Sequence, residues 1–216
     1  MQAVALGVEQ DQITTFLLPV QASNHPIYNP SLDYSVYLSQ PFFFVLFQIL
    51  ILLTTVYAIG IEIKFRTVTD WLVAAKGNMV TAILGKLLPY TIIYILIGWL
   101  ANYVMFGILH IPFQGSWWLM NIMTMLFIIA TQSLFSLFPA ISLIISIVSM
   151  VGSLGATLSG VTFPVPNMYP LVRDASNLFP VRHFTEMMQT MLYGGGGFIH
   201  LWPSAVILCI FPLLAL

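Results

Sequence analysis

Long apolar runs alternate with short polar stretches along the chain, a pattern that predicts a bundle of membrane-spanning helices. About twenty apolar residues in an α-helix cross the hydrocarbon core of a bilayer, because each residue adds about 1.5 Å. We therefore predict an all-α, polytopic membrane protein with about five transmembrane helices. The expected spans are residues 41–61, 80–109, 117–138, 140–159 and 198–216.

The stretch between the first two expected spans, residues 62–78, is the most polar part of the chain. Thr67 followed by Asp70 fits a capping box, so a short helix is expected to begin near Val68. Gly77 suits the end of that helix. Its apolar positions lie three to four residues apart, at Trp71, Leu72 and Ala75. A short amphipathic helix of this kind lies flat at a membrane surface.

Two later segments carry further local signals. In the fourth expected span, Gly152 and Ala156 are four residues apart, and small residues at this spacing let helices approach closely in lipid. Residues 160–199 hold four prolines and several charged residues, so they are not expected to span the membrane. The pattern over residues 181–193 predicts another short amphipathic helix, followed by a flexible break at residues 194–197.

The six lysines and arginines are unevenly distributed and indicate an orientation. Three of them fall in residues 62–78, whereas residues 1–40 and 110–116 contain none. Cytoplasmic loops carry the excess of positive residues. We therefore place residues 62–78 in the cytoplasm, and residues 1–40, 110–116 and 160–199 outside.

Composition supports a membrane protein, since hydrophobic residues make up 59% of the chain and charged residues 6%. A soluble domain carries about 25% charged residues. The net charge of −1 provides no basic field for nucleic acid. The single cysteine, Cys209, excludes an intramolecular disulfide and a cysteine-only metal cluster.

No catalytic or metal-binding motif is found. The chain lacks a phosphate-binding loop, a Gly-x-Ser-x-Gly elbow and a His-Glu-x-x-His helix. His183 and Glu186 are three residues apart, but two ligands are too few for a zinc site. No acid or base lies in the middle of an expected span, which argues against an ion-coupled carrier. We therefore predict no catalytic residue, no metal site and no bound cofactor in this chain.

Several short motifs follow the order and spacing of those in ABC-2-type permeases, the membrane subunits of ABC exporters, and the chain resembles that family. Residues 62–67 resemble the Glu-Arg-Glu-x-Gly-Thr signature, with Lys64 and Arg66 in place of the second Glu and the Gly. Gly85 and Lys86 match the Gly-Lys of the following span. Residues 158–164 are close to the Leu-Ser-Gly-Phe-x-Phe-Pro signature. Residues 167–170 and 179–184 resemble the Met-Pro and Pro-x-x-His/Tyr-Phe elements.

The resemblance implies a permease subunit that exports substrate by alternating access, driven by a separate cytoplasmic ATPase that binds ATP and Mg²⁺. The 62–78 segment would then hold a coupling helix docked into the ATPase. The residues expected to couple are Glu62, Lys64, Arg66, Thr67, Asp70, Trp71 and Leu72. A surface helix resting on lipid headgroups is the alternative interpretation of this segment.

The resemblance also implies short re-entrant helices in the outer leaflet over residues 160–184, forming an extracellular gate. The expected gate residues are Ser159, Gly160, Phe163, Pro164, Met168 and Pro170. A surface loop without a gating role is the alternative.

Partners and location follow from the same resemblance. The partners would be the ATPase, membrane lipid and a second permease half, identical or not, in a bacterial cytoplasmic (inner) membrane. Since family members carry a first span and a large extracellular domain, residues 1–40 are expected to be an extracellular remnant of that domain. The alternative functions are an ATP-independent secondary transporter or channel and, less favoured, a membrane-embedded enzyme built on His183 and Glu186.

Overall fold

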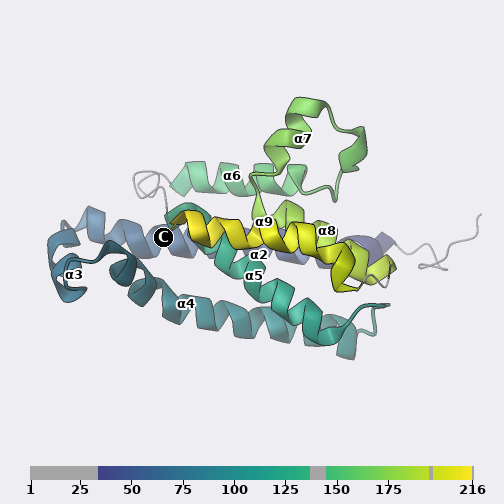
Figure 1. The fold of residues 1–216 in the computed structure, drawn as a ribbon, viewed down its shortest axis with the longest axis horizontal. Helices are drawn as coiled ribbons and strands as arrows, with labels where there is room; N and C mark the ends of the chain where they lie inside the picture. Colours follow the sequence, from purple (N-terminus) through teal and green to yellow (C-terminus); the bar gives the residue numbers. More distant parts are fainter. Residues whose placement is uncertain (1–33, 137–144, 195–196, 216) are drawn as a thin grey trace, which may run out of the picture. The chain divides into compact units, whose positions relative to one another are not determined.

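The computed structural model describes residues 34–136, 145–194 and 197–215, and every regular element within them is a helix (Figure 1). The elements are α2 (Tyr34–Lys64), α3 (Val68–Ala74), α4 (Met79–Asn102), the π-helix η2 (Tyr103–Ile108), α5 (Trp117–Ser136), α6 (Ile145–Leu158), the 3₁₀-helix η4 (Val165–Asn167), α7 (Pro170–Ser176), α8 (Pro180–Tyr193) and α9 (Phe198–Ala215). The all-α prediction is confirmed. The extracellular segment expected at residues 1–40 lies almost wholly outside the described residues.

Three of the described helices are long and apolar enough to cross a membrane. They are Leu38–Lys64, Met79–Ile108 and Trp117–Leu134, and they coincide with the first three expected spans. Phe198–Leu214 is a shorter apolar helix at the place of the fifth. The fourth expected span includes residues 140–144, which are not described, so the count of five remains a prediction.

The first helix is longer at both ends than the sequence pattern indicated. It begins at Tyr34, so Pro41 lies inside it rather than at its start. At the other end it continues to Lys64, which places Glu62 in the last helical turn instead of in a loop. The apolar run marks only the lipid-spanning part of a helix, whereas backbone hydrogen bonds carry the helix beyond that run.

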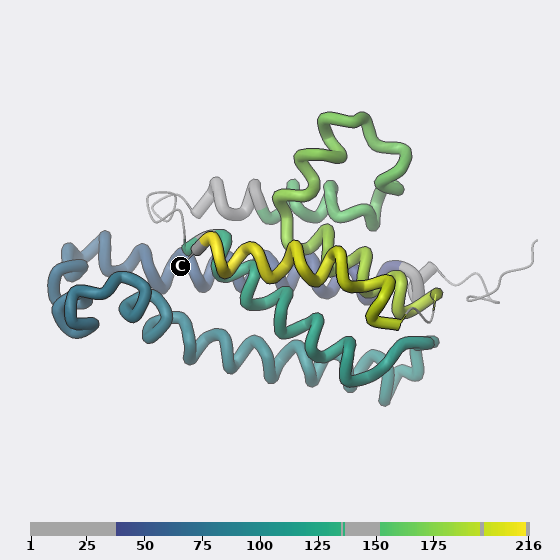
Figure 2. The backbone as a smooth tube through the Cα atoms, in the orientation of Figure 1, coloured from purple at the N-terminus to yellow at the C-terminus, as the bar shows by residue number. Residues whose placement is uncertain are grey.

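Aromatic and methionine side chains from α2, α5, α8 and α9 form the main core. Phe184 of α8 stacks on Phe127 of α5, with ring centroids 4.6 Å apart, and also contacts Phe44 of α2. α9 packs against both α5 and α8 (Figure 2). The amphipathic helix expected at residues 181–193 is confirmed as α8, and its apolar face covers this core.

Glycine and polar side chains close the contact between α4 and α5. A Cβ on Gly98 would lie 2.8 Å from the Thr124 methyl, so only glycine allows this approach. Close by, the buried Asn102 donates through Nδ2 to Asn121 Oδ1 at 3.1 Å and to Thr124 Oγ1 at 3.0 Å. Such hydrogen bonds stabilise helix–helix contacts in lipid, where burial of apolar surface contributes little to helix association.

A second glycine contact joins α2 and α6. A Cβ on Gly152 would lie 2.8 Å from Ile49 Cγ1, which confirms the small-residue packing predicted for this span. One turn further, Gly155 faces the Gln48 side chain, and Gln48 Oε1 accepts the backbone N–H of Val181 at 3.1 Å. Gln48 therefore caps the start of α8 from a neighbouring helix.

Candidate functional site

Four side chains, here called the Glu62 cluster, join the ends of three helices. Glu62 lies in the last turn of α2, Thr67 directly precedes α3, Trp71 lies within α3, and Lys86 lies in the second turn of α4. Glu62 Oε2 accepts a hydrogen bond from the Thr67 hydroxyl, and Glu62 Oε1 forms an ion pair with Lys86 Nζ. The same ammonium lies 5.2 Å from the centroid of the Trp71 ring. The cluster therefore ties the short helix to both long helices.

The ion pair of the cluster is sheltered, because the Glu62 and Lys86 side chains are each only 19% exposed. Charge-assisted hydrogen bonds in such surroundings are stronger than exposed surface pairs. Sequence reasoning identified Lys86 but assigned it no partner, and the structure pairs it with the Glu62 carboxylate. The Gly-Lys motif marked Lys86, but its partner 24 residues away could not be read from it.

The predicted capping box at Thr67 and Asp70 is wrong. Thr67 precedes α3 with φ −93° and ψ 9°, and its side chain makes no capping hydrogen bond. An N-cap residue needs an extended backbone to set its oxygen over the first turn. The hydroxyl instead binds the charged Glu62 carboxylate. The predicted start of the helix at Val68 is nevertheless confirmed.

Both α2 and α3 end in left-handed turns. Arg66 has a φ of 58°, and the next N–H, that of Thr67, donates to the Glu62 carbonyl at 3.0 Å. In the same way Lys76 has a φ of 55°, and the predicted stop, Gly77, donates to the Leu72 carbonyl at 2.8 Å. This is a Schellman ending, whose left-handed residue is usually glycine. Glycine, which the resembling signature has at the position of Arg66, adopts this backbone conformation without strain.

The seven predicted coupling residues divide into two groups. Glu62, Thr67, Trp71 and Leu72 are half-buried, whereas Lys64, Arg66 and Asp70 are exposed. Sequence reasoning missed two apolar side chains beside the exposed group: Phe65, and Val73, which is 76% exposed. Their positions outside the Trp71–Leu72–Ala75 stripe could have indicated exposure.

The predicted gate begins where α6 ends. The buried Ser159 hydroxyl donates to the Ala156 carbonyl at 2.6 Å and accepts the Val161 N–H at 3.3 Å. Gly160 follows with a φ of 90°, which turns the chain away from the helix. After the 3₁₀-helix η4, Pro170 takes the first position of α7, where its missing N–H costs no hydrogen bond.

Three of the six predicted gate residues line a common cavity of about 230 Å³, namely Ser159, Gly160 and Pro164. Phe163, Met168 and Pro170 do not line it: Met168 is buried elsewhere, and Phe163 and Pro170 are exposed. The other lining residues are Val165, Pro166, Gln189 and two charged residues that sequence reasoning did not assign to the predicted gate.

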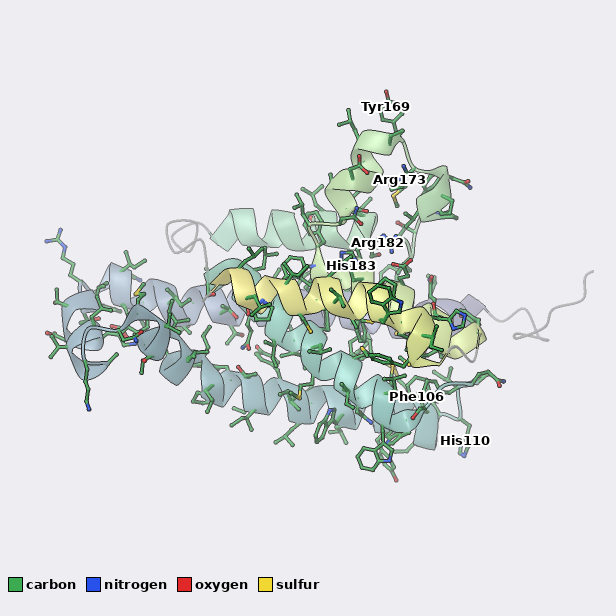
Figure 3. All side chains as sticks on the ribbon, viewed as in Figure 1. Phe106, His110, Tyr169, Arg173, Arg182 and His183 are labelled. Atoms are coloured by element: carbon green, nitrogen blue, oxygen red, sulfur yellow. The ribbon has the colours of Figure 1, made fainter. Side chains whose placement is uncertain are left out.

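These two residues are Arg182 and Glu186, from one face of α8 (Arg182 is labelled in Figure 3). Arg182 Nη1 lies 3.0 Å from Glu186 Oε2, which also accepts a hydrogen bond from the Ser204 hydroxyl of α9 at 3.1 Å. Their spacing of four residues on an expected helix was a signal that sequence reasoning did not use. The cavity is therefore partly polar.

His183 is not part of this wall. It is buried (His183 is labelled in Figure 3), and its Nε2–H donates to the Asn177 carbonyl at 3.0 Å. Burial lowers the pKa of His183, with a smaller opposing effect from the Asn177 carbonyl, so the imidazole is neutral at pH 7. Among the described residues, no three histidine, cysteine or acidic side chains gather to hold a metal ion.

Comparison with known proteins identifies a family. The family model described as "ABC-2 family transporter protein" matches residues 1–216, which is the whole chain. It therefore takes in both the Glu62 cluster and the cavity around Ser159. No curated protein and no solved structure matches the chain.

Proposed function

Because the chain belongs to the ABC-2 transporter family, we propose that it is the permease subunit of an ATP-driven exporter. Membrane subunits of this family usually work with an ATPase. In the proposed mechanism a separate cytoplasmic ATPase binds ATP and Mg²⁺, and its closure switches the permease from inward-facing to outward-facing. This chain contributes the transmembrane helices and the surface on which the closing ATPase acts.

The Glu62 cluster is the observation that carries this proposal. A displacement of α3 would be transmitted to α4 through the contact of Trp71 with Lys86. It would be transmitted to α2 through the hydrogen bond of Thr67 to Glu62. An α-helix that merely rested on lipid headgroups would need no sheltered ion pair beneath it. Rigid connection of a docking element to two long helices is what a rocking motion of the membrane half requires.

The proposed ATPase contact is the exposed side of the α3 segment. Val73 of α3 and Phe65, which follows the end of α2, are exposed, and so are three charged side chains of the same segment: Lys64, Arg66 and Asp70. An apolar centre with a charged rim is the usual composition of a protein interface. Trp71 and Leu72 are half-buried on the other side of α3, where they fix its orientation.

The segment from Ser159 to Pro170 serves as the outer gate, and the cavity wall of Arg182 and Glu186 lines the exit. We place this segment in the outer leaflet and residues 62–78 in the cytoplasm of a bacterial cell. A second permease half completes the pathway, since one bundle of about five spans cannot enclose it.

The decisive experiment is a pull-down with the ATPase that co-purifies with the wild-type chain. Val73→Glu places a charge at the centre of the contact and is expected to weaken ATPase binding roughly tenfold or more, as for an interface hot spot. Tyr169→Glu, at a similarly exposed residue directly before α7, is the control and leaves binding unchanged. Wild-type binding by Val73→Glu would refute the docking surface.

Transport assays test the energy source. Vesicles that contain only this permease should not move substrate until the ATPase and ATP are added. Transport at full rate without any nucleotide-hydrolysing partner would favour the secondary transporter or channel instead.

A further inference from the structure

Gln48, in the middle of α2, is buried where α2 meets both α6 and α8. It is 1% exposed, and its Oε1 accepts the Val181 N–H at 3.1 Å. Because only the amide oxygen can accept an N–H, this main-chain partner fixes which way the amide group points. Gly155 of α6 lies against the same group, since a Cβ there would be 2.8 Å from Gln48 Nε2. One side chain of α2 therefore reaches two neighbouring helices.

The two helices that Gln48 reaches are those that form the cavity around Ser159. Val181 directly precedes Arg182, which lines this cavity from α8. Gly155 lies four residues, one helical turn, before Ser159, which lines it at the end of α6. A side chain that contacts both helices this close to the cavity can set the distance between its walls.

The helix α2 connects this contact to the Glu62 cluster. Gln48 and Glu62 are 14 residues apart in the same helix, which is about 21 Å along its axis. Sharp kinks in helices occur mostly at proline, and residues 49–61 contain none. A displacement of the Glu62 end of α2 therefore also displaces Gln48.

The hydrogen bond of Gln48 differs in kind from two other contacts of α2. The buried Thr55 hydroxyl donates to the Ile51 carbonyl at 2.7 Å, so it is satisfied within α2 itself. Phe44 packs on Phe184 of α8, and apolar packing of this kind tolerates small sliding motions. A hydrogen bond instead depends on distance and direction. The Gln48 contact therefore fixes how α2 and α8 are placed along one another.

We propose that Gln48 is a positioning residue that transmits a displacement of α2 to the walls of the cavity around Ser159. The inference rests on the proposed function, in which an ATPase displaces α3 and this cavity lines the exit. Arg182 follows Gln48 through the neighbouring Val181 N–H, so the wall on α8 moves with α2. Without the hydrogen bond, α2 moves and α8 stays in place.

A thiol in the cavity wall reports on this motion. Gln189 lines the cavity, and Gln189→Cys together with Cys209→Ser gives a chain with a single cysteine there. The full chain is reconstituted in lipid nanodiscs with the ATPase that co-purifies with it, and the rate of labelling by a hydrophilic maleimide is measured with and without ATP. With Gln48 present, ATP should change this rate. In Gln48→Leu the two rates should become equal, while ATPase binding and ATP hydrolysis continue.

Two variants separate the positioning role from a loss of packing. Gln48→Glu keeps a carbonyl acceptor at the same length and should restore the effect of ATP. Thr55→Val is the matched control, because it removes an equally buried polar group of α2 that bonds only within its own helix. Should Gln48→Leu fold poorly, Gln48→Met removes the same acceptor with an unbranched chain.

Hydrogen exchange checks the contact without the ATPase. The Val181 amide should exchange faster by roughly tenfold or more in Gln48→Leu, as for the loss of one hydrogen bond, and at the wild-type rate in Thr55→Val.

The outcomes distinguish this inference from the proposed function. An effect of ATP in Gln48→Leu as large as with Gln48 present, or an equal loss in Thr55→Val, would overturn the positioning role and leave the exporter proposal intact. No effect of ATP even with Gln48 present would refute the proposed exit, and the positioning role would fall with it.

Discussion

Replacing Lys86 with methionine is expected to loosen α3 from the two long helices, because Lys86 contacts both Glu62 and Trp71. Methionine keeps most of the aliphatic length but removes the charge. The variant therefore loses the ion pair to Glu62 and the cation–π contact with Trp71, while the apolar packing of the stem is largely kept.

The magnitude follows from how far the contact is sheltered. Exposed ion pairs contribute about 0.2–1 kcal/mol, whereas hydrogen bonds to charged groups contribute about 1.5–3 kcal/mol. With Glu62 and Lys86 each 19% exposed, we expect a coupling energy between these limits, about 1–2 kcal/mol. The contact of Lys86 with the Trp71 ring adds about 0.5–1 kcal/mol.

A double-mutant cycle of Glu62→Gln and Lys86→Met isolates the first of these energies. The assay is the free energy of unfolding of the purified protein in detergent micelles, from urea titration. Hydrogen exchange of the α3 amides gives a local readout, and exchange should be faster in Lys86→Met. Lys76→Met, at an exposed lysine beyond α3, is the matched control.

A coupling energy below about 0.3 kcal/mol is within the error of additivity and would refute the reasoning. It would mean that water screens the pair and that Glu62 does not join α2 to α4. Equally fast exchange of the α3 amides in Lys86→Met and Lys76→Met would lead to the same conclusion.

Three further outcomes are expected. Arg66→Gly relieves the left-handed backbone at φ 58°, so it should increase the free energy of unfolding by up to about 1 kcal/mol and raise the thermal midpoint, whereas Arg66→Ala should do neither. Gly98→Val places its side chain against Thr124 and should cost about 1–3 kcal/mol more than Gly85→Val, where a Cβ meets nothing within 4 Å, by urea unfolding. Since burial lowers the pKa of His183, the free energy of unfolding should fall as the pH drops below about 6.5, and His183→Gln should flatten this dependence; identical pH profiles would contradict it.

Much of the fold could be predicted because its signals are local. The length of an apolar run fixes a spanning helix, which is why the first three expected spans match the candidate spans of the structure. The start of α3 at Val68, its end at Ala74 shortly before the expected stop at Gly77, and the amphipathic α8 were predictable for the same reason. Each depends on residues within a few positions of one another.

The candidate site was only partly predictable. The motifs marked most residues of the Glu62 cluster, but not the contacts that connect them. Thr67 has two possible partners, the first turn of its own helix and a carboxylate five residues back, and local pattern favoured the wrong one. Arg182 and Glu186 join the cavity around Ser159 only because α8 packs against α6.

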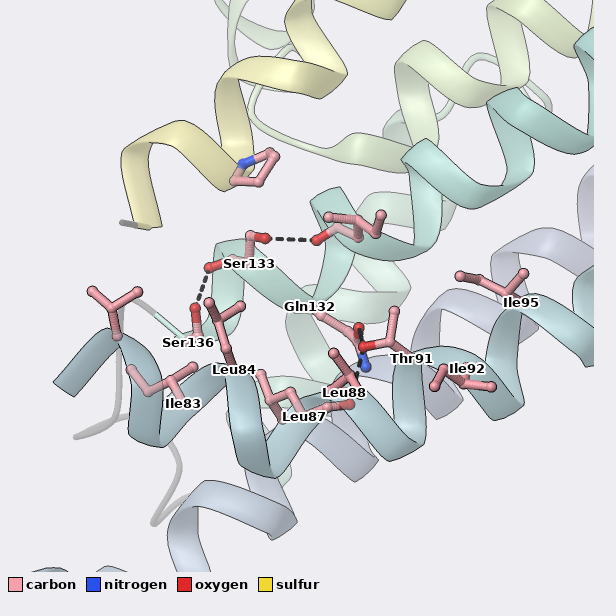
Figure 4. A pocket seen from close by; sticks show the side chains of 13 residues that line it. Ile83, Leu84, Leu87, Leu88, Thr91, Ile92, Ile95, Gln132, Ser133 and Ser136 are labelled. Atoms are coloured by element: carbon pink, nitrogen blue, oxygen red, sulfur yellow. Dashed lines mark hydrogen bonds between the residues drawn. The ribbon is translucent and has the colours of Figure 1, made fainter. Parts of the chain in front are cut away.

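The sequence by itself determined that this chain is helical, which of its segments are long and apolar enough to cross a membrane and where its polar segments lie, because hydrophobicity and backbone preference act over short distances. Tertiary structure alone decided which apolar faces meet protein and which meet lipid, since both media are apolar and a hydrophobic residue suits either. It also paired Glu62 with Lys86 and placed Gln132 in the wall of a cavity between α4, α5 and α9 (Figure 4). Such contacts join residues far apart along the chain, so they exist only once the helices have packed.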